Sequence, residues 1–507
     1  MSINVTTAAL VGLAAERVEI EADIFRSLPG FQIVGLPDAA VSEAKERVRS
    51  AIKNSGARFP ATKVIVNLSP ADLRKEGPAY DLPIALAVLT ATRALDADLT
   101  NKVFAGELAL DGRLRPIRGA LAMALFAAKH KIPEIYLPQA NCAEASVVPG
   151  ITVYPIRDLA ELVRHLSGQE FIESAKKKSA KKRQLFAGLD FSEIRGQEQA
   201  KRALVIAAAG GHNVLLEGPP GSGKTMLARA LPGILPKLSF AEAIETTCIH
   251  SVAGLLPPNY GLVKERPYRS PHHTVSGAAL IGGGTSPKPG EVSLAHQGVL
   301  FLDELPEFPR ALLDQLRQPL EDGFVTVARI QGVVSYPTRI ILVASCNPCP
   351  CGFLTDSRIS CQCNDRDKQN YLRRISGPFL DRIDLRVHVP RLSKEEIMDR
   401  KQIKEKQTLH IRERVEQARK VQAKRWQTTT HTNANIRQKD FLRTLDLEPA
   451  GQKLLSQAIE HFNLSPRGYF RILRVARTIA DLDLSGRIKE NHIAESLQFR
   501  GKIEIGQ

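Results

Sequence analysis

The chain of 507 residues contains no apolar run of about 18 residues, the length that a membrane-spanning helix requires. Its first residues lack the basic start of a secretory signal and turn acidic early. We therefore expect a cytoplasmic protein that does not enter a membrane. Aromatic residues amount to only 5% of the chain, which disfavours a stacking platform for single-stranded nucleic acid.

Cysteine is also scarce, with seven residues in the chain, and five of them fall between Cys346 and Cys363. A disulfide framework would not be so clustered in a chain of this length, so the cluster indicates a metal site in a reducing compartment. Two Cys-x-Cys pairs separated by nine residues supply four thiolates for one tetrahedral Zn²⁺, in an insert at residues 346–364. The alternative is a set of reduced thiols without a metal. The four predicted ligands are Cys349, Cys351, Cys361 and Cys363.

Acidic residues are outnumbered, with 54 Asp and Glu against 70 Lys and Arg, so the formal net charge is +16. Such a surplus is typical of proteins that bind a polyanion, most often nucleic acid, although it also keeps proteins soluble. Six of the eight residues in the segment 176–183 are basic, and a run of this kind repels itself and stays solvated. We assign a basic linker to residues 171–189, after a first domain at 1–170. A solvated tether and a nucleic-acid-binding arm both remain open for this linker.

A complete phosphate-binding loop follows the short apolar run Asn213–Glu217 and precedes the helix-like run Met226–Leu231. Strand, glycine-rich loop and helix are the context that the pattern G-x-x-x-x-G-K-[ST] requires, and a chance glycine-rich turn is the alternative. Backbone N–H groups and the helix N-terminus attract the phosphates, the lysine reaches the β- and γ-phosphates, and the threonine binds Mg²⁺. The sequence therefore predicts a protein driven by ATP and Mg²⁺. The predicted ATP ligands are Gly218, Pro219, Pro220, Gly221, Ser222, Gly223, Lys224 and Thr225.

A second apolar run, Val299–Leu302, ends in two carboxylates. Asp303 at the end of this run is suited to hold Mg²⁺, and Glu304 to orient or deprotonate the attacking water. A third run, at residues 339–345, ends near Asn347, whose amide can contact the γ-phosphate or the water. An ordinary Asn-Pro turn is the alternative for Asn347.

The apolar runs at 213–217, 299–303 and 339–345 alternate with helical segments, which is typical of a parallel α/β sheet. We assign this ATPase core to residues 190–392. The chain then becomes helical and charged, and we assign a helical lid to residues 393–507. Earlier in the chain, in the first domain, we predict a strand at 63–68 and helices at 82–95 and 120–129.

Longer blocks of the sequence resemble the magnesium-chelatase-like AAA+ proteins, namely SPHHTVSGAALIGGG, PGEVSLAHQGVLFLDELPEF, ASCNPCPCG, GPFLDRIDL and LSPRGYFRILRVARTIADL. Within these proteins, the whole chain resembles the bacterial ComM/YifB group. The resemblance implies a homohexameric ring with ATP bound between subunits, in which Asn347 acts as sensor 1. Arg382 matches the arginine finger that completes the neighbouring site, although a local ion pair with the flanking Asp residues is the alternative. Arg467 matches sensor 2, with Arg471 and Arg474 as alternatives one turn away.

Residues 71–90 and 106–128 resemble the proteolytic domain of Lon proteases, an α+β fold similar to domain 2 of ribosomal protein S5. The positions of the catalytic serine and lysine of that family fall on Ala79 and Leu121. Neither a nucleophile nor its base remains, so we expect an assembly or DNA-channel domain and not a protease.

Residues 325–336 alternate around a polar tip and predict a β-hairpin. The segment resembles the presensor-1 hairpin of the MCM helicases, whose basic tip faces DNA, and Arg329 matches that tip. Residues 268–290 resemble a further channel loop, the second-helix insert, which carries Lys288. Contacts with the nucleic-acid backbone suit a motor that moves along DNA of any sequence.

Two functions therefore fit the sequence. The first is a hexameric, ATP-dependent DNA motor, a branch-migration helicase that acts in recombination during natural transformation. Its partner would be single-stranded, duplex or branched DNA. The second is a chelatase-like ATPase for metal insertion or protein remodelling. The net charge, the basic hairpin tip and the additional first domain favour the DNA motor.

The adjacent His272 and His273 have no third metal ligand nearby, so we assign no metal to them.

Overall fold

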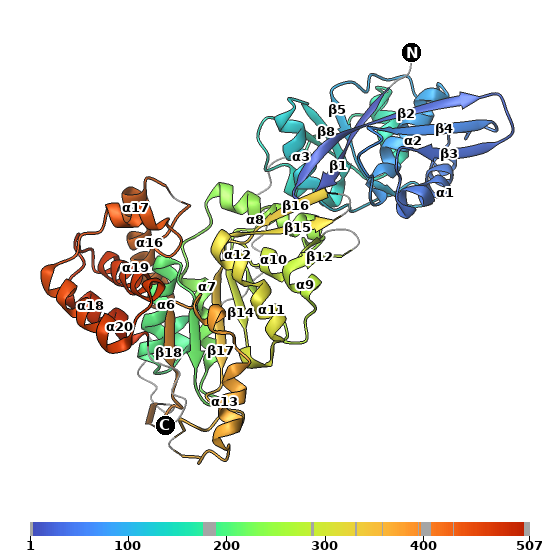
Figure 1. Cartoon of the computed structure of the whole chain (residues 1–507). Coiled ribbons are helices and arrows are strands. Elements are labelled where there is room, and N and C mark those ends of the chain that lie inside the picture. Colours follow the sequence, from blue (N-terminus) through green and yellow to red (C-terminus); the bar gives the residue numbers. More distant parts are fainter. Residues whose placement is uncertain are drawn as a thin grey trace. The chain divides into compact units, whose positions relative to one another are not determined.

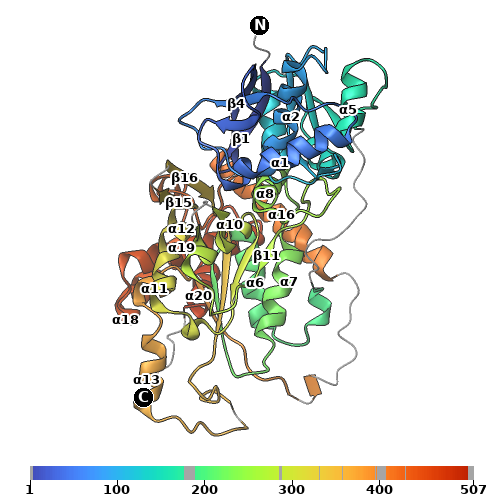
Figure 2. The same cartoon turned by 90° about the vertical axis from the view of Figure 1, so that its right-hand side faces the viewer.

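The computed structural model describes residues 4–175, 189–284, 288–329, 332–356, 358–393, 395–396, 407–428 and 430–500. The chain divides into two compact units (Figures 1 and 2). The first unit holds Met1–Arg183 and Phe240–Val263, and the second holds Gln184–Ser239 and Lys264–Gln507. Most of the predicted basic linker lies outside the described residues. None of the described helices is both long and apolar enough to cross a lipid bilayer.

The first unit is built on a seven-stranded sheet in the order β3-β4-β2-β1-β5-β8-β9. Strand β2 shows why the sequence forms this sheet, because its Val18 and Ile20 are buried while the intervening glutamates are not. The strands are β1 Val5–Val11, β2 Ala14–Phe25, β3 Gly30–Val34, β4 Lys63–Ser69, β5 Lys102–Phe104, β8 Glu134–Pro138 and β9 Thr152–Ile156, with a small pair β6 Glu107–Leu108 and β7 Leu114–Arg115. The helices between them are α1 Ala39–Asn54, α2 Asp81–Ala91, α3 Ala120–Lys129, α4 Cys142–Ala145 and α5 Leu159–Leu166.

The two positions that the resemblance matches to the Lon-type catalytic pair lie in one apolar cluster of this unit. Leu121 is fully buried on α3, and Ala79 packs against the same cluster from a short 3₁₀ turn, Pro78–Tyr80. Neither side chain offers a nucleophile or a base.

The segment Phe240–Val263 belongs to this first unit, although the sequence analysis had assigned it to the ATPase core. Helix α8, Phe240–Ala253, packs against α3 and places Cys248 in the same apolar cluster. Backbone bonds fix the segment as well. The N–H of Gly119 donates to the carbonyl of Ser251 at 3.2 Å, and the N–H of Asn259 donates to that of Ala140 at 2.8 Å.

The second unit contains a five-stranded parallel sheet in the order β11-β14-β17-β10-β18, as the alternating strands and helices predicted. Alternate residues of each strand enter different apolar clusters. Val214 and Leu216 of β10 pack with helices α6 and α7, and Leu215 packs on the other face. Both faces are covered, which explains the uninterrupted apolar runs. The strands are β10 Val214–Glu217, β11 Tyr268–Arg269, β14 Val299–Leu302, β17 Ile341–Cys346 and β18 Leu385–His388.

Helices cover both faces of the five-stranded sheet, and two short strand pairs, separate from it, are inserted into this core (Figure 1). The helices are α6 Glu198–Gly210, α7 Lys224–Ile234, α9 Gly277–Ile281, α10 Glu291–Leu294, α11 Arg310–Gln315, α12 Arg317–Asp322, α13 Asp365–Arg373 and α14 Gly377–Leu380. The inserted pairs are β12 Gly282–Gly283 with β13 Lys288–Pro289, and β15 Phe324–Arg329 with β16 Gly332–Pro337.

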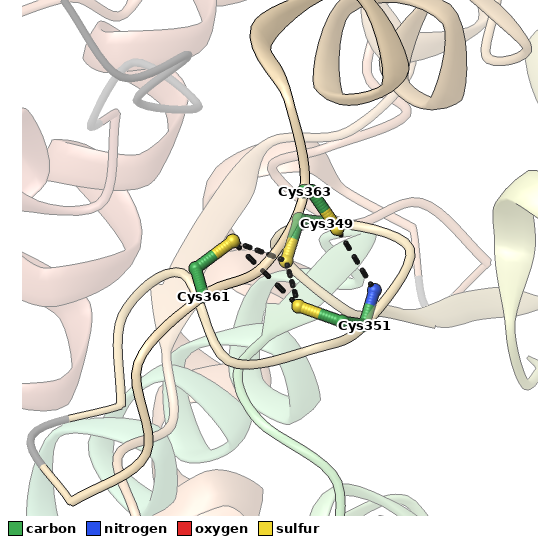
Figure 3. Close-up of side chains that lie close together, drawn as sticks. All are labelled: Cys349, Cys351, Cys361 and Cys363. Atoms are coloured by element: carbon green, nitrogen blue, oxygen red, sulfur yellow. Dashed lines mark hydrogen bonds between the residues drawn. The ribbon is translucent and has the colours of Figure 1, made fainter.

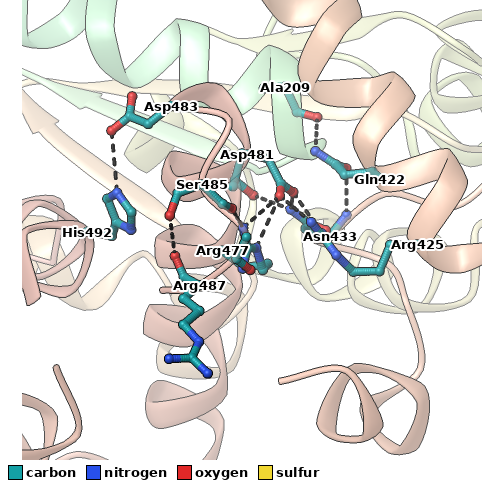
Figure 4. Close-up of polar contacts among 12 residues, drawn as sticks. Ala209, Gln422, Arg425, Asn433, Arg477, Asp481, Asp483, Ser485, Arg487 and His492 are labelled. Atoms are coloured by element: carbon teal, nitrogen blue, oxygen red, sulfur yellow. Dashed lines mark hydrogen bonds and ion pairs between the residues drawn. The ribbon is translucent and has the colours of Figure 1, made fainter. Parts of the chain in front are cut away.

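The C-terminal part of this unit is the predicted helical lid, and it is held together around one buried carboxylate (Figure 4). Asp481 of α19 is fully buried and accepts hydrogen bonds from Arg477, Arg425 and the amide of Asn433. Gln422 extends the network to α6, because its side-chain amide donates to the carbonyl of Ala209 at 3.1 Å. The lid helices are α16 Gln407–Trp426, α17 Gln438–Arg443, α18 Pro449–Phe462, α19 Pro466–Leu482 and α20 Glu490–Gln498.

Replacement of Asp481 by alanine should destabilise the lid strongly. The Arg477 guanidinium, which is 2% exposed, would lose the carboxylate that balances its charge. Loss of one partner of a buried pair costs about 3–5 kcal/mol. The measurement is the urea midpoint of unfolding, followed by the fluorescence of Trp426 in the lid. The control is Asp446→Ala, which breaks the exposed Arg487–Asp446 pair and should cost less than about 1 kcal/mol. Equal shifts for the two variants would contradict this account of the lid.

Candidate functional site

The phosphate loop, residues 218–225, joins the end of β10 to the start of α7. Its glycines are required by the geometry. A Cβ on Gly218 would lie 2.1 Å from the carbonyl oxygen of Val389, just after β18. Gly221 and Gly223 have φ angles of +77° and +94°, a region that favours glycine. The N–H groups of Gly218 and Ser222 donate to backbone carbonyls of the protein, namely those of Cys346 and Pro219. The first N–H groups of α7 have no intrahelical acceptors, as at any helix start, and are suited to phosphate oxygens.

Lys224 is the first residue of α7, and its side chain folds back over the loop. The ammonium donates to the carbonyl of Gly218 at 2.7 Å, to that of Pro219 at 2.9 Å and to Oδ1 of Asn347 at 3.2 Å. Burial lowers the pKa of this amine, because the charged form loses solvent. A phosphate group beside the amine would restore a favourable environment for its charge.

Asp303 lies directly after β14 and connects three segments of the site. One carboxylate oxygen accepts a hydrogen bond from Thr225 Oγ1 at 3.1 Å. The other accepts from the hydroxyl of Ser345 on β17 and from the backbone N–H of Glu304 at 3.2 Å. Thr225 and Asp303 are thus adjacent, as a shared Mg²⁺ requires, and their oxygens are the ligands that this ion prefers.

Glu304 has an unusual backbone for a non-glycine residue, with φ +53° and ψ +52°. This left-handed conformation turns the side chain away from the strand direction, and 58% of the side chain is exposed. Its nearest charged neighbour is His273, with Nδ1 3.9 Å from Oε2. Backbone strain of this kind costs about 1–3 kcal/mol and is found preferentially at functional sites. A half-exposed carboxylate at this edge of the sheet is suited to orient a water molecule.

Three residues that the sequence analysis did not assign to the site contribute to it. Ser345 holds Asp303, His273 faces Glu304, and Gln197 donates to the carbonyls of Pro390 at 2.6 Å and Ser222 at 3.3 Å. Ser345 lies at the end of an already predicted strand, so its position was a usable signal. Nothing in the local sequence indicates the contacts of Gln197.

The predicted arginines lie in different environments. Arg382 forms an ion pair with Glu321 and donates to the carbonyl of Pro378, so its ion pair is not with a flanking aspartate, which was the alternative to the arginine finger. Arg471 and Arg474 donate to backbone carbonyls of their own unit, of Ile383 and of Ala434 and Ile436 respectively. Arg467 is exposed at the start of α19, and the described residues give it no hydrogen bond or ion pair.

The predicted hairpin is formed by β15 and β16, which pair in register from Phe324 with Pro337 to Arg329 with Gly332. Figure 2 shows it beside α12, with which β15 is in contact. Arg329 therefore occupies the last described position before the tip, and residues 330–331 lie outside the described residues. Lys288 is exposed on β13, which pairs with β12 in the insert at 268–290.

Relatives of this chain match it over nearly its whole length. The competence protein ComM of Haemophilus influenzae is 43% identical over 98% of this chain and 97% of its own length. The chain belongs to the ComM/YifB family of AAA+ ATPases. An uncharacterised protein of Escherichia coli, YifB, is 42% identical over 99% of this chain and 97% of its own length.

Family models and a partial relative account for the separate parts of this ComM/YifB-family chain. The model described as "Magnesium chelatase, subunit ChlI" matches residues 190–397, and that of the ChlI C-terminal part matches 405–500. A further model, "Subunit ChlI of Mg-chelatase", matches 20–141. Lon protease 2 of Bacillus subtilis is 34% identical over 143 residues, 26% of this chain and 25% of its own length. Membership of the AAA+ class implies ATP and Mg²⁺ as cofactors.

The four predicted zinc ligands lie together on two arms of one loop (Figure 3). All four sulfur atoms are within 4.8 Å of one another. Cys349 Sγ is 3.3 Å from Cys351 Sγ, and Cys361 Sγ is 3.6 Å from each of them. Four sulfurs at about 2.3 Å around one tetrahedral Zn²⁺ would be roughly 3.8 Å apart. The donor set therefore fits this ion.

The electrostatics of the cluster also suit a metal. Burial works against ionisation of Cys351, but hydrogen bonds, first those from the backbone N–H groups of Phe353 and Gln362, lower the pKa of its thiol to about 6. Burial raises the pKa of Cys349 to about 12. A Zn²⁺ ion would stabilise all four thiolates, the form in which cysteine binds metal.

The cysteine loop packs directly on the phosphate loop. A Cβ on Gly352, the residue after Cys351, would lie 2.7 Å from Cδ of Pro220 and 3.7 Å from Cγ of Asn347. Asn347 in turn precedes the first ligand, Cys349, by two residues. The cluster therefore fixes the backbone that presents the Asn347 amide to Lys224.

We expect about one Zn²⁺ per chain in protein purified without chelators, measured by elemental analysis. Cys351→Ser should lose the metal during dialysis against a chelator concentration at which the unaltered protein retains it. ATP turnover should fall with it, because the Asn347 backbone loses its support. The control is Cys142→Ser in the first unit, which should retain the metal. Metal-free wild-type protein with full ATPase activity would contradict the assignment.

Proposed function

We propose that the protein is a ring-forming, ATP-dependent DNA motor that moves branched DNA junctions during recombination. The observation that carries the proposal is the assembled ATP site, in which Lys224, Thr225, Asp303, Glu304 and Asn347 meet at one edge of the sheet. Such a site can drive mechanical work, and the remaining argument concerns the polymer on which the work is done.

Three features favour DNA as that polymer. The chain has a net charge of +16. A β-hairpin inserted between β14 and β17 carries Arg329 next to its tip, so a movement of these two strands would reach the hairpin. The relative that is 43% identical over nearly the whole chain is named a competence protein. Natural transformation is therefore the process that we propose, with the cytoplasm as its place.

A chelatase-like ATPase for metal insertion or protein remodelling is the second candidate function. The names of the three matching family models favour it. These models describe the architecture of the ATPase and its neighbours. The coverage and identity of the ComM relative bear more directly on this chain, because they extend over both units and every element of the site.

Each residue of the ATP site has its own role in the proposed hydrolysis of ATP. The phosphate loop and Lys224 hold the phosphates, and the amine neutralises charge on the transferred group. Mg²⁺, held by Thr225 and Asp303, supplies further neutralisation when it is bound. Glu304 orients the attacking water and takes its proton, and the Asn347 amide positions the terminal phosphate. Arg382 faces Glu321 in its own chain, and we propose that in a ring of six it reaches the site of the next subunit.

The test of the DNA motor compares ATP hydrolysis with and without a four-way DNA junction. Arg329→Ala should keep its basal hydrolysis, because the ATP site lies elsewhere, but lose DNA stimulation and junction movement together. Its DNA affinity should become less salt-dependent, by about one unit of slope. The control is Arg437→Ala, which removes an 86% exposed arginine of the lid. Full junction movement by Arg329→Ala would return the chelatase-like reading to contention.

The ring itself is tested by mixing two inactive proteins. Lys224→Ala should not bind ATP productively. Arg382→Ala removes the proposed arginine finger and should hydrolyse ATP about 10³-fold more slowly. Mixed subunits should regain part of the activity, because some interfaces then combine an intact loop with an intact arginine. Normal hydrolysis by Arg382→Ala alone, with DNA present, would remove this residue from the site.

A further inference from the structure

A cavity of about 490 Å³ lies beside β18, outside the ATP site. Its walls come from the residues before and within β18, from the turn between α18 and α19, and from the end of α20. This size is in the range of pockets that hold small organic ligands. All of these elements belong to the second unit.

The cavity lies at the amino ends of the strands, whereas the phosphate loop lies at their carboxyl ends. Strand β18 is parallel to β10, with Leu385 paired to Val214 and His388 paired to Glu217. The loop follows Glu217 at the carboxyl ends of the strands, whereas Ile383 and Asp384 of the cavity precede β18 at the amino ends. A ligand here would therefore not be a ligand of the same chain's phosphate loop.

Three arginines from three elements line the cavity, namely Arg386 of β18, Arg471 of α19 and Arg500 after α20. Arg471 donates to the Ile383 carbonyl at 3.3 Å, and Arg500 donates to the Gly468 carbonyl at 2.9 Å. Each of these arginines has further N–H donors beyond those bonds. The backbone N–H of Arg386 donates to the carbonyl of Phe499 at 2.7 Å, but its guanidinium has no hydrogen bond or ion pair within the part of the chain that the structure describes.

The cationic charge of the cavity is only partly balanced. Asp384 is the one carboxylate in the lining. It forms an ion pair with Arg471, whose Nε lies 3.7 Å from Asp384 Oδ1, and it is also bound by His212 Nδ1 and by the N–H of Asn213, each at 3.2 Å. Burial lowers the pKa values of Arg386, Arg471 and Arg500, and a neighbouring guanidinium lowers each of them further, whereas Asp381 acts in the opposite direction on all three. Three arginines against Asp384 and Asp381 leave a surplus of one positive charge, and the forked guanidinium donors match the oxygens of a phosphate.

The rest of the lining combines apolar side chains with the polar Asn463, Ser465 and Gln498. It includes Phe462, half of which is exposed. An aromatic ring beside a guanidinium cluster suits a ligand that has both a flat or apolar part and a phosphate group. We propose that this cavity is a second phosphate-binding site of the protein, which holds a phosphate of a nucleotide through Arg386, Arg471 and Arg500.

Two sources could supply that phosphate, namely a nucleotide bound freely in the cavity, or the nucleotide in the phosphate loop of a neighbouring subunit. The second source rests on the proposed ring. This second source is consistent with the position of Arg382, which we propose to reach the neighbouring site and which directly precedes the cavity residue Ile383. The first source requires neither a ring nor DNA.

The test uses the Lys224→Ala chain, which lacks the loop lysine, and inorganic pyrophosphate as the probe. Calorimetry should show binding that falls about tenfold or more in Lys224→Ala/Arg386→Gln, because one charge-assisted contact is lost. Arg500→Gln in the same background should have a similar effect, and it decides the question if the Arg386 variant does not fold. The control is Lys224→Ala/Arg487→Gln, which removes an exposed arginine remote from the cavity lining and should bind like its parent.

A second measurement distinguishes the two sources of the phosphate. Pyrophosphate binding by the dilute, single Lys224→Ala chain that depends on Arg386 identifies a freely bound phosphate compound. If the single chain does not bind it, but Arg386→Gln and Arg500→Gln lower ATP hydrolysis by the assembled protein, the phosphate belongs to the neighbouring subunit. If neither pyrophosphate binding nor assembled hydrolysis responds to the two substitutions, the site does not exist. None of these outcomes depends on DNA, so the proposal can fail while the DNA motor stands.

Discussion

The carboxylate of Asp303 is the contact on which the ATP site depends. It joins the start of α7 through Thr225, the end of β17 through Ser345, and its own strand through the N–H of Glu304. This is possible because β14 and β17 run parallel in a fixed register. The register pairs Leu302 with Ala344, so the next two residues, Asp303 and Ser345, are neighbours. A slip of either strand by one residue would turn its side chain at this position toward the opposite face of the sheet.

The sequence was sufficient for those parts of the site that follow from strand ends. The apolar runs before the phosphate loop, before Asp303 and before Asn347 are buried on both faces, so the sequence shows where each strand begins and ends. A parallel sheet brings the carboxyl ends of such strands together. Helix α3 has the bounds expected from the sequence. In contrast, the contact of His273 with Glu304 and the pairing of Arg382 with Glu321 join residues that are far apart in the chain. Only the folded chain shows such contacts.

The positive charge of the chain illustrates why composition is a coarse guide to function. Several arginines donate to carbonyls near helix ends within the protein. Arg412 caps the end of α7 at Gly233, Arg419 binds the carbonyl of Ala208 near the end of α6, and Arg474 binds two carbonyls between α16 and α17. Cations at these positions satisfy unpaired carbonyls and the negative end of the helix dipole. Only part of the net charge of +16 is therefore available to a polyanionic partner.

The assignment of Phe240–Val263 to the first unit changes how the chain can be divided. The polypeptide passes from one unit to the other three times, once near the basic segment and again at each end of this insertion. A cut at the basic segment would leave each fragment incomplete. The first would lack the helix that covers α3, and the second would carry that helix with its apolar face, including Cys248, in water. The two units have thus become interdependent in folding, and an exchange of the first unit between relatives would have to carry this distant segment with it.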